Sequence, residues 1–597
     1  MNPEAAKPAS PPTLDGVKLA IMSSRMDGIV ARMTNTLLRT ARSSVLAVAK
    51  DFSCCLLAAN GDLLAMAEAE PIHVLNSDLL GKALNELQPS IRPGDAFLNN
   101  SPYHGNTHAA DWSVLVPIFD DDGIHRCTAV AKGHQADCGN SIPTTYHGSA
   151  KDVYEEGALI FPCVKVQSDY KDVEDIVRMC KLRIRVPDQW WGDYLALMGA
   201  ARIGEREMIE FGREVGWDVI DSFIGRWFDY SESTMIEAVK SLTGGRATVR
   251  GWHDPVPGAD DLPVNVTVEV DPENATIDVD LRDNMDCQPF GLNLSEACSS
   301  GAALAGVFCG ICADIPFNGG SMRRVRVHLR ENCMVGIPRH PYSCSASTTN
   351  LADRVANAVM NAMATLGDGM GRAEYGLVLP PSIGVISGND PRRDGAPFVD
   401  EVFLHGLTGG AATPHADGWL TSTDAVTLGM GLLDSTELDE IAFPIRVLEQ
   451  RLIPDSEGAG RTCGSPGAMT VMQAVGTPID IWYGSDGTVN PARGVRGGGD
   501  GGRAEAWKQL RSGEIVEAPA QGLVRLESGE AIISKSCGGG GYGSPLERDA
   551  LRVLHDATEG RISLARARDV YGVVIDNGEI DEAATARLRS SGAASGA

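Results

Sequence analysis

Hydrophobic residues recur along the first part of the chain with the spacing of an amphipathic helix. Between residues 14 and 48, apolar side chains return every three or four positions, as Met22, Met26, Ile29 and Met33 do. Residues 51–66 change to a strand-like pattern interrupted by Asn60-Gly61, a dipeptide typical of tight hairpin turns. The pattern therefore predicts a long helix followed by a β-hairpin.

The rest of the chain mixes helical and strand-like patterns. Helical periodicity is found in 76–88, 170–243, 348–366 and the last 50 residues, period-two alternation in 247–283, and a Gly-rich, β-leaning pattern in 372–545. Because no strand–helix–strand rhythm and no internal repeat are present, we expect an α+β fold with mixed antiparallel sheets. The changes of pattern divide the chain into four expected regions: 1–245, 246–375, 376–550 and 551–597.

Two neighbouring segments are predicted to pair as an antiparallel hairpin. Residues 112–119 place Trp112, Val114, Val116 and Ile118 on one face, and residues 124–132 form the second strand candidate. The intervening DDDG sequence is a turn. With the turn centred near Asp121 and Asp122, we expect Asp111 opposite roughly Lys132 and His108 opposite roughly Gln135.

This hairpin would gather four metal-capable side chains at one end, namely His108, Asp111, His134 and Asp137. Two imidazoles and a carboxylate suit a divalent metal such as zinc, manganese or iron, with positions open for water or substrate. Asp137 would be either a further ligand or a partner that orients a histidine. The alternative is a polar hairpin end whose histidines have ordinary hydrogen-bond partners.

Charge and cysteine content narrow the class of protein. Of the 597 residues, 52 are Lys or Arg and 79 are Asp or Glu, a formal charge of -27. Such an acidic chain repels nucleic acid and anionic membranes, so neither is an expected partner. The N-terminus lacks the features of a signal peptide and no 18-residue apolar run is present, so the expected location is the cytoplasm. The 14 cysteines are then expected to be free, and Cys309-Gly-Ile-Cys312 to be structural.

Several segments, in the same order along the chain, resemble the hydantoinase B/oxoprolinase family. They are DFSCCLLAANGDLLA (51–65), NNSPYHGNTHAADWSVLVPIF (99–119), GHQADCGNSIPTTYHGSAKDVYEEGALIFPCVKV (133–166), RGGGDGG (496–502) and GGGGYGSPLERD (538–549). This family includes hydantoinases, 5-oxoprolinases and the large subunits of acetone and acetophenone carboxylases. The resemblance implies metal ligands at His108, Asp111 and His134, the group that the hairpin reasoning selects. Ser101 departs from the family's usual aspartate.

The resemblance also implies that ATP and magnesium bind a partner, a hydantoinase A-type subunit, in a hetero-oligomer. This chain has no GxxxxGKS/T phosphate loop, and its glycine runs are expected to allow close backbone packing. We expect first the carboxylation of a ketone with bicarbonate after phosphorylation on the partner, with a small third subunit as a further possible component. The alternatives are ATP-dependent hydrolysis of a cyclic amide and a non-catalytic scaffold with a structural metal.

Further catalytic candidates lie near these motifs. They are Asp51 as a general base or a partner of a metal ligand, His73 and His147 as residues facing the substrate, and Asp137. Each has a structural alternative, such as a turn anchor or a buried polar residue with ordinary partners. The expected cofactor is one divalent metal, zinc first, with manganese or iron as alternatives.

Overall fold

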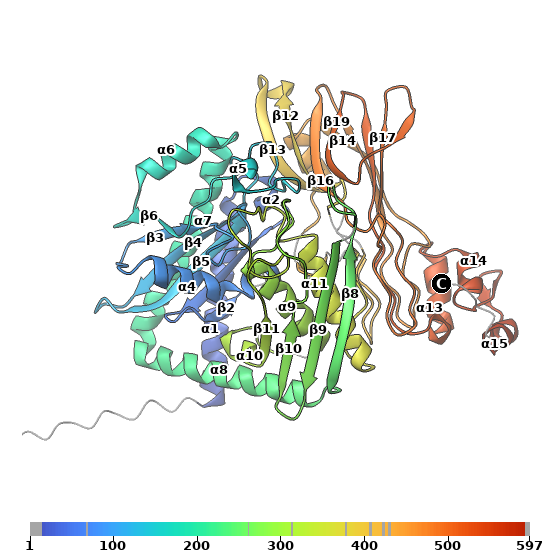
Figure 1. Ribbon diagram of the computed structural model, residues 1–597, viewed down its shortest axis with the longest axis horizontal. Coiled ribbons are helices and arrows are strands. Elements are labelled where there is room, and N and C mark those ends of the chain that lie inside the picture. Colours follow the sequence, from blue (N-terminus) through green and yellow to red (C-terminus); the bar gives the residue numbers. More distant parts are fainter. Residues whose placement is uncertain are drawn as a thin grey trace, which may run out of the picture.

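Helices and mainly antiparallel sheets are mixed along the chain (Figure 1). The computed structural model describes residues 15–66, 70–260, 262–311, 314–376, 379–404, 409–420, 424–427 and 432–590. The predicted α+β class is confirmed. No helix in these ranges combines the length and the apolar character needed to cross a bilayer.

A seven-stranded antiparallel sheet forms the N-terminal part of the fold, in the order β2-β1-β5-β4-β3-β6-β7. Its strands are β1 (Phe52–Ala58), β2 (Leu63–Met66), β3 (Ala96–Asn99), β4 (Asp111–Phe119), β5 (His125–His134), β6 (Val164–Ser168) and β7 (Lys171–Asp172). The predicted hairpin of residues 51–66 is confirmed as β1 and β2.

Both faces of this sheet are covered by helices. The predicted N-terminal helix is α1 (Gly16–Thr40), which packs with α7 (Pro187–Val215) on the face that carries Trp112 and Val114. The opposite face, with Leu115 and Val130, packs against α4 (Ser77–Leu87). Because both faces are buried, all residues of β4 are buried.

The hairpin of β4 and β5 exists, but its predicted register is wrong by about two residues. Asp111 pairs with His134, whereas Lys132 lies opposite Ser113. The strands end at Phe119 and His125, and a register irregularity follows Ile118, so the connection is centred nearer Asp122 than predicted. The shift places the carboxylate directly across from the histidine.

A second sheet packs on two helices made largely of small residues. Its order is β11-β10-β9-β8, with β8 (Gly245–His253), β9 (Leu262–Asp271), β10 (Thr276–Asp280) and β11 (Val325–His328). Helices α9 (Glu296–Ile311) and α11 (Leu351–Leu366) lie against it and against each other. A Cβ atom added at Gly306 would lie 2.7 Å from Cβ of Val359, so the small residues of α9 permit close helix packing.

The β-leaning C-terminal part forms two further sheets that share one hydrophobic core. One, in the order β13-β12-β16-β19, contains β12 (Ile383–Asp390), β13 (Ala396–Phe403), β16 (Ile479–Gly484) and β19 (Gln521–Leu526). The other, in the order β14-β15-β20-β17-β18, contains β14 (Ile445–Leu452), β15 (Ala468–Ala474), β17 (Glu505–Gln509), β18 (Ile515–Glu517) and β20 (Ala531–Lys535).

The remaining elements are short apart from α8 and α6, and the last three helices lie at one end of the longest axis (Figure 1). They are α2 (Ser44–Ala47), α3 (Pro71–Val74), α5 (Val153–Glu156), α6 (Glu174–Arg183), α8 (Trp217–Lys240), α10 (Gly319–Met322), α12 (Thr436–Ala442), α13 (Ala550–Thr558), α14 (Leu564–Asp569), α15 (Glu582–Ser590), two 3-10 turns (Pro391–Arg393, Pro545–Glu547) and the pair β21 (Ile575–Asp576) and β22 (Glu579–Ile580). The region boundaries at 245, 375 and 550 stay predictions. Cys309 is buried in α9, while Cys312 lies outside the described residues.

Candidate metal centre

Three neighbouring strands of the first sheet place three candidate ligands close together, at the ends of the strands. Asp111 begins β4, His134 ends β5, and Asp51 immediately precedes β1, on the other side of β5. The backbone nitrogen of His134 donates to the carbonyl oxygen of Asp51 at 3.2 Å. The strand order β1-β5-β4 therefore aligns Asp51, His134 and Asp111.

The fourth residue, His108, is positioned by the loop that leads into β4. The side-chain amide of Asn106 donates to the carbonyl oxygens of His108 and Asp111, each at 2.9 Å. The hydroxyl of Ser113 in β4 donates to Asn106 Oδ1 at 2.8 Å. The side chain of buried Asn106 thus donates the hydrogen bonds that these two backbone carbonyl oxygens would otherwise receive within a helix or sheet.

The functional atoms of His108, Asp111 and His134 converge. Nε2 of His108 lies 2.9 Å from Asp111 Oδ1, and Nδ1 of His134 lies 3.2 Å from the same oxygen. One ligand atom from each residue falls within 4.8 Å of the other two, and all three residues are buried. Hydrogen bonding from Thr107 holds the second oxygen of Asp111.

The protonation of His108 follows from its second ring nitrogen. Nδ1 lies 2.7 Å from the carbonyl oxygen of Ser345, which can only accept, so Nδ1 carries a proton. In the neutral ring Nε2 then presents a lone pair to Asp111 Oδ1, which is also an acceptor. Only a proton or a cation between these atoms makes the contact favourable, and a carbonyl behind the ring is the usual arrangement of a metal-bound histidine.

Burial keeps His134 neutral. It lowers the pKa of His134 to about 4, and the ring stacks on Tyr146 with centroids 5.1 Å apart. Burial by itself would raise the pKa of Asp111, but His108 and His73 hold that pKa well below its usual value. A neutral imidazole and an ionised carboxylate are the forms that bind metals, so this donor set fits a divalent cation.

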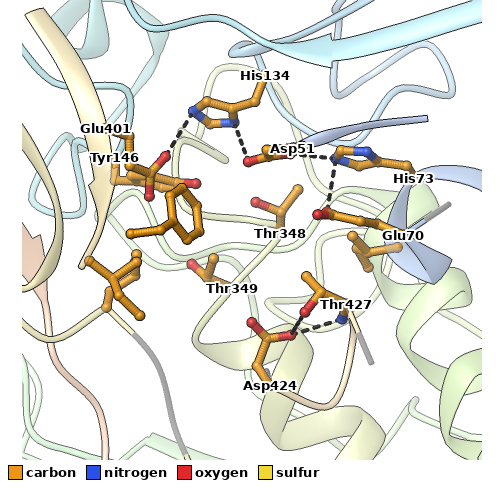
Figure 2. Close-up of a pocket in the computed structure, with 14 residues that line it drawn as sticks. Asp51, Glu70, His73, His134, Tyr146, Thr348, Thr349, Glu401, Asp424 and Thr427 are labelled. Atoms are coloured by element: carbon orange, nitrogen blue, oxygen red, sulfur yellow. Dashed lines mark hydrogen bonds and ion pairs between the residues drawn. The ribbon is translucent and has the colours of Figure 1, made fainter. Parts of the chain in front are cut away.

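A small cavity of about 40 Å³ adjoins the centre (Figure 2). The predicted residues Asp51, His73 and His134 line it, together with Glu70, Tyr146, Glu401 and Asp424. Burial raises the pKa values of Asp51, Glu70 and Glu401 well above their usual ranges, and the charge of Asp111 adds to this effect on Asp51. The cavity thus combines several carboxyl groups with an apolar lining of Ile72, Leu379, Ile383 and Phe403.

Two predicted catalytic residues are not brought into this cluster. Asp137 accepts hydrogen bonds from the backbone nitrogen of Arg185 at 2.6 Å and from its guanidinium at 2.9 Å. Nδ1 of His147 lies 3.4 Å from the hydroxyl of Ser149, and the centroid of its ring lies 6.3 Å from that of Trp482. The geometry gives Asp137 a structural ion pair and leaves His147 outside the walls of the 40 Å³ cavity.

Sequence reasoning missed Glu70, Tyr146 and Glu401. Glu70 precedes His73 by three residues, a spacing that the short helix α3 turns into proximity. Glu401 lies in β13, where two consecutive acids interrupt an otherwise apolar strand, FVDEVF. That local signal identifies a buried carboxylate, but nothing in it connects Glu401 to His134, 267 positions earlier, whose Nε2 lies 3.7 Å from Glu401 Oε2.

Two known proteins of related sequence match most of the chain. The beta subunit of caprolactamase from Pseudomonas jessenii is 27% identical over 595 residues, which cover 96% of this chain and 98% of that protein. The 5-oxoprolinase of Saccharomyces cerevisiae is 25% identical over 572 residues, which cover 91% of this chain and 43% of that longer protein.

Solved structures share the fold over nearly the whole chain. The crystal structure of ATP-dependent caprolactamase from Pseudomonas jessenii matches with a TM-score of 0.88 at 27% identity, covering 97% of this chain and 100% of that one. A nucleotide-free structure of acetone carboxylase matches with a TM-score of 0.84 at 18% identity, covering 96% and 82%. The second likeness shows a common fold alone.

A family model for hydantoinase B/oxoprolinase matches residues 15–545. The predicted resemblance is therefore confirmed, and with it the prediction that the chain is an enzyme subunit of a hydrolase or carboxylase. The chain belongs to the hydantoinase B/oxoprolinase family.

Proposed function

We propose that this chain carries the hydrolytic centre of an ATP-dependent enzyme that opens a cyclic amide such as a hydantoin, 5-oxoproline or a lactam. The observation that carries the proposal is the buried convergence of His108, Asp111 and His134, with Asp51 alongside, at the wall of a carboxyl-lined cavity. The full-length likeness to caprolactamase supports this choice of reaction.

The three residues would hold one divalent cation, with zinc as the first candidate and manganese or iron as alternatives. A cation bound there would make a bound water acidic enough to attack the activated amide carbon at neutral pH. Asp51 faces the same centre, since its Oδ2 lies 3.9 Å from Nδ1 of His134. The carbonyl group behind His108 and the hydroxyl of Thr145 behind His134 would orient the two rings.

The leaving nitrogen of an amide needs a proton, and Glu401 is placed to supply it. Its side chain lines the cavity, is 1% exposed, and has no hydrogen-bond partner for either oxygen within the described residues. Burial raises the pKa of Glu401 well above its usual range, which favours the protonated form of this carboxyl. A protonated carboxyl beside the scissile bond is the usual general acid for such a step.

ATP would act on a partner, a hydantoinase A-type subunit that phosphorylates the amide oxygen before water attacks. The glycine run of this chain supports that division. The amide nitrogens of Gly539, Gly540 and Gly541 donate to the carbonyl oxygens of Ser465, Glu374 and Gly499, so they are not free to cradle phosphates. We therefore infer a hetero-oligomer.

Carboxylation of a ketone with bicarbonate is the first expectation from the sequence and ranks second here. The carboxylase likeness extends to the fold at 18% identity, whereas the caprolactamase likeness is both closer and complete in length. A small third component is part of the carboxylase alternative only. A scaffold with a purely structural metal fits poorly, because a structural site has no need of a carboxyl-lined cavity.

The variant His134→Ala tests the proposal in the complex with its ATPase partner. We expect product formation from cyclic amides to fall to background, because the centre loses a ligand, while partner-dependent ATP cleavage persists. His125→Ala, at the opposite end of β5, is the control and should retain turnover. Full turnover in His134→Ala would contradict the proposal. If the wild-type complex forms product from a ketone and bicarbonate but not from cyclic amides, carboxylation is favoured instead.

A further inference from the structure

A second group of metal-capable side chains lies on the other side of Asp51. One ligand atom each from Asp51, Glu70 and His73 falls within 4.8 Å of the other two, and all three residues are buried. Nε2 of His73 lies 3.7 Å from Asp51 Oδ1, 3.8 Å from Glu70 Oε2 and 3.2 Å from Oδ2 of Asp111 in the first group. Asp51 therefore turns one oxygen toward His73 and the other toward His134.

The orientation of His73 is fixed from behind. Its Nδ1 lies 3.2 Å from the hydroxyl of Ser53 in β1, and that same hydroxyl accepts a hydrogen bond from the backbone nitrogen of Glu70 at 3.1 Å. Ser53 thus links the two residues and directs Nε2 of His73 at the carboxylates. Such support from a neighbouring polar group is what orients a histidine ligand.

More residues of this second group than of the first group line the small cavity. Asp51, Glu70 and His73 all line it, whereas of the first group only His134 does (Figure 2). Its volume of about 40 Å³ exceeds the roughly 10–15 Å³ that one water molecule needs. An ion with a bound water therefore has room there.

Buried oxygen atoms at this cavity lack partners. Within the described residues, Oδ1 of Asp51 and both carboxyl oxygens of Glu401 have no hydrogen-bond donor, and these residues are 8% and 1% exposed. A buried acceptor without a donor is costly, and a cation is the alternative that satisfies it.

Within the ranges that the structure describes, the carboxyl groups around the cavity also lack lysine and arginine partners. Five buried carboxyl groups gather here, from Asp51, Glu70, Asp111, Glu401 and Asp424. In the described parts of the chain none of them forms an ion pair with lysine or arginine, and histidines are their only ion-pair partners. Among the described residues, these buried acids therefore lack a cationic side chain to pair with, and a bound cation would supply that partner.

We propose that Asp51, Glu70 and His73 hold a second divalent cation, so that Asp51 is shared between two metal sites. The inference rests on the proposed function for the first site, at His108, Asp111 and His134, and adds a site of its own. Two carboxylates with one imidazole and room for water favour manganese among the common ions. The chain would then carry a two-metal centre.

The number of metal ions bound per chain tests the proposal of a second site. The full-length chain with its partner is stripped with chelator, loaded with manganese alone, desalted and measured by elemental mass spectrometry. We expect two manganese ions per chain in the wild type and one in Glu70→Gln, an isosteric change that removes one ligand charge. Circular dichroism checks the fold, and His73→Asn serves as the second variant if Glu70→Gln does not fold.

The matched control is Glu401→Gln, the same isosteric change on a carboxyl group of the same cavity outside the triad, which should still bind two ions. One ion in the wild type, two in Glu70→Gln, or the same loss in Glu401→Gln would each overturn the proposal. Because the count needs no turnover, failure of cyclic-amide hydrolysis leaves this result readable. Conversely, loss of the second ion with intact hydrolysis would leave the proposed function standing.

Discussion

Thr145 illustrates how a residue that touches no substrate supports the centre. Its hydroxyl lies 3.0 Å from Nε2 of His134, on the side of the ring opposite Asp111. The next residue, Tyr146, stacks on both His134 and His108. These contacts fix the ring so that Nδ1 points at Asp111, and a ligand held in place binds a metal more tightly than one free to rotate.

Replacing Thr145 by valine should therefore weaken metal binding by about 10–100-fold, since the ring loses its orienting partner while the volume is kept. Competition with a chelator of known affinity measures the change. Thr128→Val is the control, because Thr128 lies in β5 and its hydroxyl also contacts a histidine, His125, at 3.0 Å. Equal affinities in wild type and Thr145→Val would show that the ring is held by packing alone.

At the residue scale, the sequence predicts those site residues that share a local pattern. His108, Asp111 and His134 follow from one hairpin and from family motifs, and the structure brings them together. Glu401 has no such route, because its proximity to His134 depends on how β13 docks. A buried polar residue is visible in a sequence, but its partner is not unless both belong to one local element.

At the element scale, the start of the short helix α2 and the two residues before it connect α7, which covers the first sheet, to β13 of the third sheet. The backbone nitrogens of Arg42 and Ser43 donate to Asp193 of α7, and those of Ser44 and Val45 donate to Asp400 of β13. Asp400 neighbours Glu401, so this clamp helps to set where Glu401 meets the cavity. Burial raises the pKa of Asp400 to about 7.

This clamp predicts a pH dependence of stability. Because the folded-state pKa of Asp400 is raised, its contribution to the free energy of unfolding is complete below the unfolded pKa, about 4, and is lost as the pH rises through about 7. The full effect is on the order of 4 kcal/mol. We expect urea midpoints to fall between about pH 4 and 7, and Asp400→Asn to flatten that fall.

The measurement that matters is the slope of the urea midpoint against pH. Asparagine at position 400 also disturbs the hydrogen bonds from Ser44 and Val45, which lowers stability at every pH. Asp122→Asn, in the exposed turn between β4 and β5, should leave the slope of the wild type unchanged. A slope in Asp400→Asn equal to that of the wild type would show that Asp400 does not titrate in this range.

At the scale of the whole molecule, glycine segments far apart in sequence interlock. A Cβ atom added at Gly541 would lie 2.0 Å from the carbonyl oxygen of Ala459, and one at Gly498 would lie 2.2 Å from that of Gly541. Gly458 donates a backbone hydrogen bond to Gly539, and Gly541 donates one to Gly499. The prediction that these runs serve close backbone packing is confirmed.

Gly541→Ala should therefore destabilise the protein by at least about 3 kcal/mol, because backbone on both sides must move. Thermal unfolding followed by calorimetry would show a lower midpoint. Gly225→Ala is the matched control: this glycine is in α8, with nothing within 4 Å of an added Cβ. It should be neutral or stabilising by roughly 0.5–1 kcal/mol, as expected for a helix interior. Equal midpoints for Gly541→Ala and the wild type would contradict the packing role.

Local sequence patterns were enough to predict the class of fold, the main helices, the hairpin of β4 and β5 and the convergence of His108, Asp111 and His134. These features depend on periodicity, turn residues and short-range pairing, which are written locally in the chain. The packing of the folded chain was needed for the two-residue register shift, the separation of Asp137 from the cluster, and the arrival of Glu70 and Glu401 at one cavity. Those outcomes depend on contacts between distant elements, which no local pattern encodes.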